Sequence, residues 1–173
     1  MTVRPPVFLC GFMGSGKSTL GKKTARTLNM PFIDLDKRVE EAQQKSIPEI
    51  FKQEGEAAFR ELESLHLRKI LQEKPSCLIA LGGGTVCFND NLSFLKSKGL
   101  LVYLELPALV LAHRLWHSKT ERPLLKHKTE TEVEAYVEDL LEKRKVFYEA
   151  AHLKVNALHL SAEQLHNEIL ALL

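Results

Sequence analysis

The chain has 173 residues, 45% of them hydrophobic, and its 24 Lys and Arg nearly balance its 22 Asp and Glu, for a formal net charge of +2. This length suits one domain with a sizeable core, so we expect a single domain over residues 1–173. The balanced charge gives no reason to expect nucleic acid or an anionic membrane as the main partner.

The cysteines favour a reducing compartment. Cys10, Cys77 and Cys87 are odd in number and form no C-x-x-C pair. Because Cys10 and Cys77 lie in apolar runs, we predict buried free thiols there. Free thiols are typical of the cytoplasm, which is the location we expect.

No secretory leader or membrane span is expected. The apolar run that follows Arg4 is short and is interrupted at once by Gly11. The most apolar stretch, residues 100–116, contains charged residues and a proline, so it is interpreted as a strand followed by a helix.

Short apolar runs alternate with helical patterns along the whole chain. The predicted strands are at 7–10, 32–33, 77–81, 100–104 and 153–155. Most are almost continuously apolar, as in a parallel sheet covered on both faces. Five such strands indicate an α/β, three-layer, doubly wound fold, in which ligands bind at the carboxyl ends of the strands.

The first strand is followed by a phosphate-binding motif. Residues 11–18 read G-F-M-G-S-G-K-S, which fits G-x-x-x-x-G-K-[ST], and a helix is predicted over 19–28. Backbone N–H groups of such a loop wrap a polyphosphate, and the helix N-terminus adds a positive dipole. Lys17 can reach the β- and γ-phosphates, and the Ser18 hydroxyl can bind Mg²⁺. The motif therefore predicts a nucleoside triphosphate as ligand.

Two carboxylates follow the second strand in the sequence Asp34-Leu35-Asp36. Alternation along a strand lets both point past its end, toward the phosphate loop. One could hold a water on Mg²⁺, and the other could bind an acceptor hydroxyl and take its proton. The alternative is that Asp36 only caps a helix that begins at Lys37.

The next helical segment carries its own boundary signals. Ser46 and Glu49 have capping-box spacing with a proline in the first turn, and Ser161 and Gln164 repeat that spacing before the last helix. Gly55 is expected to divide the segment 48–71 into two helices.

Three glycines, Gly82 to Gly84, end the third strand, where many motor and switch NTPases have a metal-binding Asp. A backbone without side chains there would let a ligand approach closely. The alternative is that the loop needs glycine only because its residues have positive φ. Arg60 and Arg144 could together grip a substrate carboxylate, although each alone is more often a solvated surface charge.

A long polar stretch between two helices, at about 116–130, includes Arg122. Long connections are often active-site lids or flexible linkers. As a lid, this stretch would bring Arg122 to the transferring phosphoryl group and exclude water.

Taken in order, these motifs resemble shikimate kinase over nearly the full chain. The matching segments are G-F-M-G-S-G-K-S-T at 11–19, D-L-D at 34–36, S-I-P-E-I-F at 46–51, G-E-A-A-F-R at 55–60, L-G-G-G at 81–84, R-P-L-L at 122–125 and K-R-x-x-x-Y at 143–148. The glycine loop alone is widespread, whereas the ordered combination is specific to the family.

The resemblance implies a five-stranded parallel sheet of order 2-3-1-4-5 and the ATP-dependent phosphorylation of shikimate to shikimate 3-phosphate. It implies an acceptor-binding segment at about 35–63 and a lid at about 116–130. The catalytic residues would be Lys17, Asp36 and Arg122. ATP would contact Gly14, Ser15, Gly16, Lys17, Ser18, Thr19 and Arg122. Shikimate would contact Asp36, Arg60, Gly83 and Arg144, and Mg²⁺ would be held by Ser18 and, through water, Asp34.

This chain departs from the family pattern in two places. Val146 stands where the family often has Pro. The absence of that proline would straighten the helix that carries Arg144. Leu115 follows Arg114 where relatives often carry a further basic residue, so no arginine is assigned to adenine.

Two other functions remain open from the sequence. One is another P-loop small-molecule kinase, such as a gluconate kinase or a nucleoside-monophosphate kinase, because these share the fold and the loop. The other is a nucleotide-binding regulatory module, which typically needs a metal-binding Asp that is not evident here. We expect a monomer that binds small molecules and no nucleic acid or membrane.

Overall fold

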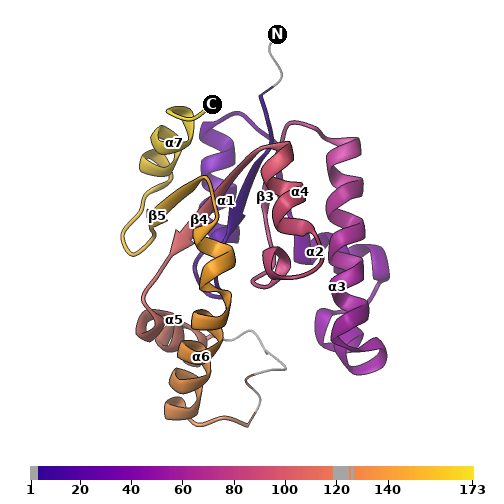
Figure 1. The fold of residues 1–173 in the computed structure, drawn as a ribbon, viewed down its shortest axis with the longest axis vertical. Coiled ribbons are helices and arrows are strands. Elements are labelled where there is room, and N and C mark those ends of the chain that lie inside the picture. Colours follow the sequence, from indigo (N-terminus) through magenta and orange to yellow (C-terminus); the bar gives the residue numbers. More distant parts are fainter. Residues whose placement is uncertain (1–3, 119–124, 126) are drawn as a thin grey trace.

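The computed structural model describes residues 4–118, 125 and 127–173 (Figure 1). The strands and the helices that connect them alternate as the apolar pattern predicts. In chain order the elements are β1 Val7–Cys10, α1 Lys17–Thr27, β2 Phe32–Asp34, α2 Leu35–Gln43, α3 Ile47–Glu73, β3 Leu78–Ala80, the 3₁₀ turn η1 Thr85–Cys87, α4 Asn91–Lys98, β4 Leu100–Glu105, α5 Ala108–Trp116, α6 Glu130–Glu149, β5 Leu153–Asn156 and α7 Ala162–Leu170.

The five strands form one parallel sheet in the order β2-β3-β1-β4-β5, which confirms the expected topology. In register, Leu9 of β1 lies between Ala80 of β3 and Val102 of β4. The central strand β1 is therefore flanked on both sides, and its carboxyl end opens directly into the phosphate loop. The order changes direction beside β1, where open α/β sheets bind their ligands.

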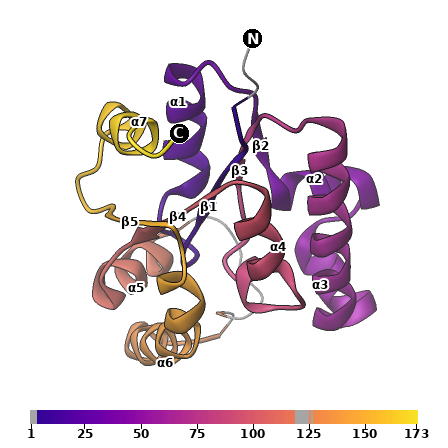
Figure 2. The same cartoon turned by 45° about the horizontal axis from the view of Figure 1, so that its top comes forward.

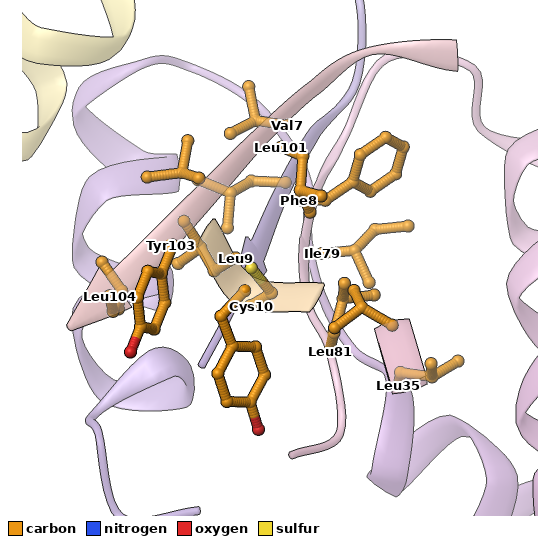
Figure 3. Close-up of a cluster of buried hydrophobic side chains, with 14 of the residues drawn as sticks. Val7, Phe8, Leu9, Cys10, Leu35, Ile79, Leu81, Leu101, Tyr103 and Leu104 are labelled. Carbon is orange, nitrogen blue, oxygen red and sulfur yellow. The ribbon is translucent and has the colours of Figure 1, made fainter. Parts of the chain in front are cut away.

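The core is centred on β1. All four of its residues are fully buried, and side chains from β3 and β4 surround them (Figure 3). Because both faces of the sheet are covered, the central strands can be almost continuously apolar. Helices α1 and α7 pack together on one side of the sheet, and α4 lies on the other (Figures 1 and 2). Cys10 and Cys77 are buried free thiols, as predicted.

The helix boundary signals are borne out. Ser46 with Glu49 and Ser161 with Gln164 form reciprocal capping boxes. Thr129 with Glu132 forms a third one, which was not predicted from the sequence. Gly55 has φ 85° and ψ 170°, so α3 is broken there as expected. Helix α6 runs without a break through Val146, in agreement with the absence of Pro.

One local expectation is wrong. Helix α2 begins at Leu35, not at Lys37, and Asp34 is its N-cap, since the Asp34 carboxylate accepts a hydrogen bond from the Lys37 amide. Asp36 therefore lies in the first turn of the helix instead of alternating with Asp34 along the strand. The strong N-cap preference of Asp acts two residues earlier than expected.

Among the helices of the described ranges, none has the length and apolar character needed to cross a bilayer.

Candidate active site

The phosphate loop connects β1 to α1 and depends on its glycines. Gly11, Gly14 and Gly16 have φ of 140°, 82° and 93°, a region that other L residues rarely adopt. A Cβ on Gly11 would also lie 2.7 Å from the Leu104 carbonyl oxygen. Gly16 is the N-cap of α1 and offers no side-chain cap. The loop therefore leaves the amides at the start of α1 available to an anion.

Two cations lie against this loop. The Lys17 ammonium donates to the carbonyls of Gly11 at 2.8 Å and Phe12 at 2.9 Å, which holds it across the loop. Arg114, from α5, donates to the carbonyl of Gly14 at 3.2 Å. Positive charge is therefore supplied from two elements to the position where phosphates would bind.

Ser18 and Asp34 form a pair at the start of α1. The Ser18 hydroxyl donates to one oxygen of Asp34, and the other oxygen caps α2. A hydroxyl beside a carboxylate is a donor set that suits Mg²⁺, which binds few protein oxygens and keeps waters and phosphates as its remaining ligands. In the part of the chain that the structure describes, no group of three or more His, Cys, Asp and Glu side chains gathers to hold a metal ion.

The Asp36 carboxylate faces the triglycine segment. It is half-buried, and its Oδ1 is buried without a hydrogen-bond partner among the described residues. Burial, followed by the charges of Glu63 and Asp34, raises the pKa of Asp36 to about 7, against the opposing effects of Lys17 and Arg60. A carboxyl with this pKa can take up or release a proton near neutral pH.

Arg60 belongs to a buried ionic network on α3. It is 7% exposed, and its Nη1 donates at 2.6 Å to Glu63, which is only 1% exposed. The other Glu63 oxygen accepts from the Thr85 hydroxyl at 2.6 Å. On its outer side Arg60 pairs with Glu56 at 2.8 Å, and its guanidinium lies over the Phe88 ring. The guanidinium is thus held in one orientation.

Arg144 approaches from the opposite side, on α6. It is also 7% exposed and donates to the Gly83 carbonyl at 3.2 Å. The Tyr148 hydroxyl, one turn later on the same helix, donates to the same carbonyl. Helix α6, which is unbroken at Val146, therefore directs Arg144 at the triglycine segment.

Each of the three glycines meets a different neighbour. A Cβ on Gly82 would collide first with Glu63 Oε1 and would lie 2.8 Å from Asp36 Oδ1. A Cβ on Gly83 would lie 3.1 Å from the Met13 amide nitrogen, and one on Gly84 2.9 Å from the Arg60 guanidinium. None of the three has a φ in the left-handed region. Close approach, not positive φ, is therefore the reason for this glycine run.

The structure thus brings most of the predicted residues together. Gly14, Ser15, Gly16 and Thr19 surround Lys17 and Ser18 in the loop and first helical turn, and Ser15 is buried. Asp36, Arg60, Gly83 and Arg144 converge beside them. Arg122 and much of the predicted lid lie outside the described residues.

Glu63 of this site was not singled out from the sequence, and Arg114 and Tyr148 were noted there without a role in the site. Glu63 carried a usable signal, because it lies three residues after Arg60 and four before the buried Leu67, on the face of α3 that packs inward. A carboxylate on such a face needs a buried partner. Arg114 and Tyr148 reach the site only through tertiary packing.

A phosphate-binding loop on a sheet of this order, facing one carboxylate and two arginines, defines a P-loop kinase whose acceptor is a small anionic molecule. The Shikimate kinase family model matches residues 13–173. A shikimate kinase from Bacteroides thetaiotaomicron is 44% identical over 151 residues, covering 87% of this chain and 86% of that protein.

Solved structures agree with this match. A crystal structure of shikimate kinase from the same bacterium has a TM-score of 0.89 at 41% identity, covering 97% of each chain. Shikimate kinase from Acinetobacter baumannii in complex with shikimate has a TM-score of 0.86 at 35% identity, covering 98% of this chain and 92% of that one. The chain belongs to the shikimate kinase family.

Proposed function

We propose that this protein transfers the γ-phosphoryl group of ATP to a hydroxyl of shikimate, forming shikimate 3-phosphate and ADP. The observation that carries this is the convergence of the Asp36 carboxylate with Arg60 and Arg144 on the bare backbone of Gly82 to Gly84, beside the phosphate loop. Family membership supports the same acceptor.

The phosphate loop would hold ATP through Gly14, Ser15, Gly16, Lys17, Ser18 and Thr19. Lys17 is our proposed catalytic cation: on leaving the Gly11 and Phe12 carbonyls, its ammonium can bridge the β- and γ-phosphates. Mg²⁺ would be held by Ser18 and, through water, Asp34, and it would neutralise phosphate charge. Arg122 would approach the γ-phosphoryl group from the lid.

Asp36 is the proposed base. Its unpartnered Oδ1 can accept a hydrogen bond from the acceptor hydroxyl and then its proton as the new P–O bond forms. Shikimate bound nearby brings its own carboxylate, for which Arg144 and Arg60 would provide the donors. Because Glu56 is the exposed partner of Arg60, the shikimate carboxylate would replace Glu56 while the buried Glu63 keeps the guanidinium in place.

Catalysis would then rest on positioning and on charge neutralisation, as in other phosphoryl transfers. We further propose that residues 1–173 form one domain, with the acceptor segment at about 35–63 and the lid at about 116–130, and that the protein works as a cytoplasmic monomer.

The decisive experiment measures ADP release with shikimate, gluconate and AMP in parallel at equal ATP and Mg²⁺. We expect turnover with shikimate to exceed that with either other acceptor by at least about 10³-fold, because an acceptor whose anionic group and hydroxyl cannot reach the two arginines and Asp36 together leaves buried groups unpaired. A preference for gluconate or AMP would refute the assignment. Arg144→Lys should raise the KM for shikimate at unchanged KM for ATP.

A further inference from the structure

A groove separate from the triglycine segment runs between α1, β2, α2 and the end of α3. Its volume is about 850 Å³, which lies in the roughly 300–1,000 Å³ range of small-molecule sites. Ser18 and Asp34 lie in its lining, and so do residues from further along α1 and from the carboxyl end of α3. It therefore extends from the metal-binding end of the phosphate loop to a region that the proposed reaction does not use.

The lining is strongly basic although the whole chain is almost neutral. The groove has three acidic residues, Asp34, Glu41 and Glu73, and its six basic residues are Lys22, Lys23, Arg26, Lys37, Arg38 and Lys74. Of these six basic residues, only Arg38 forms an ion pair among the described residues, with Glu73 at 3.0 Å. The other five have no ion pair or side-chain hydrogen bond within the described part of the chain.

A second, smaller recess adjoins this groove and shares two of its lining residues. Arg38 and Glu41 line both, and the recess adds His66 and Lys69. His66 is 7% exposed, and its Nε2 is buried without a hydrogen-bond partner among the described residues. A buried ring nitrogen that lacks a partner is costly, and an N–H there can donate to an anion.

These observations share one explanation. Like charges gathered in a concave surface focus a positive potential and repel one another, so a multiply charged anion is the ligand that relieves both effects. Phosphoryl oxygens accept several charge-assisted hydrogen bonds at once, and lysine ammonium groups act on them as point charges. We propose that this groove, which we call the α1–α2 groove, binds a small anion carrying two or more phosphoryl groups, in addition to the ATP of the reaction.

The far end of the groove is separable from the ATP site. Arg26 lies eight residues after Ser18 on α1, which is about 12 Å along a helix axis. Lys74 is the C-cap of α3, on the other wall. Both side chains are exposed, so they can be changed without disturbing the core or the phosphate loop.

The test uses the full chain saturated with Mg²⁺ and a non-hydrolysable ATP analogue, so that the phosphate loop is already filled. Inorganic tripolyphosphate is titrated into it by calorimetry. The test variant is Arg26→Gln/Lys74→Gln, and the control is Lys98→Gln/Lys145→Gln, which removes the same charge from exposed positions outside the groove. Unchanged phosphorylation of shikimate in both variants shows that they are folded.

We expect tripolyphosphate to bind the loaded protein and to lose at least about tenfold in affinity in the groove variant, with less than a twofold change in the control. Perturbation of the His66 ring signals in NMR spectra should accompany binding. The proposal is overturned if the loaded protein does not bind tripolyphosphate, if both variants lose affinity equally, or if a single-stranded oligonucleotide binds the groove more tightly than tripolyphosphate does.

Discussion

Replacing Asp36 by Asn should stabilise the unliganded protein at alkaline pH while abolishing most of its activity. The native pKa of Asp36 is about 7 against an ordinary value of 3.8. Because the folded-state pKa is raised, the folded protein keeps this proton over a range in which the unfolded chain has lost it. Stability should therefore fall as the pH rises from about 4 to about 7, and stay reduced above 7.

The size of the effect follows from the pKa difference. Each pKa unit corresponds to about 1.4 kcal/mol, so the folded protein carries on the order of 4 kcal/mol of unfavourable free energy from the Asp36 charge above pH 7. Asn fills nearly the same space without the charge. Its free energy of unfolding should exceed that of the native protein by an amount approaching this figure at pH 8.5, and the difference should vanish near pH 4.

Urea unfolding of both proteins, without ligands, at pH 4, 5.5, 7 and 8.5 measures this difference. Asp139→Asn, which removes an exposed carboxylate paired with Lys143, serves as the control and should show no such pH dependence. A stability difference that does not change with pH would refute the raised pKa. In the same variant, kcat should fall by roughly 10²–10⁴-fold while ATP still binds, as expected for loss of a general base.

Further substitutions test the rest of the site. In the native enzyme the acidic limb of the plot of kcat/KM against pH should have its midpoint near pH 7. Glu63→Gln should move this midpoint to lower pH, because the Glu63 charge helps to raise the pKa of Asp36. An unchanged midpoint would show that the limb reports the titration of another group. Gly84→Ala should raise the KM for shikimate about tenfold, since its Cβ would lie 2.9 Å from the Arg60 guanidinium. Gly55→Ala, whose Cβ meets nothing within 4 Å, should leave that KM unchanged and cost about 1–3 kcal/mol of stability through its backbone conformation, φ 85° and ψ 170°. Equal kinetic effects of the two substitutions would contradict the role of close approach. Ser18→Ala should raise the Mg²⁺ concentration that gives half-maximal rate and leave the KM for shikimate unchanged, and the reverse pattern would remove Ser18 from the metal site.

Local chemistry made much of this protein predictable from its sequence. The phosphate loop could be assigned because positive φ requires glycine, and the order of strands and helices because parallel strands buried on both faces are almost wholly apolar. The capping boxes at Ser46 and Ser161 were also predictable, because a capping residue and its partner lie only three residues apart in the sequence.

Tertiary structure alone decided how distant residues act on one another. The pKa of Asp36 depends on Glu63, which lies 27 positions away in sequence, and Gly83 is contacted by Arg144 and Tyr148 from another helix. The triglycine run was predicted as a bare backbone, but only packing shows that a separate side chain or amide requires each glycine. Backbone conformation and capping depend on neighbours along the chain, which is why the phosphate loop could be assigned from its residues. Burial and electrostatic coupling depend on which elements meet in space. The arrangement of the acceptor site could therefore be described only from the tertiary structure.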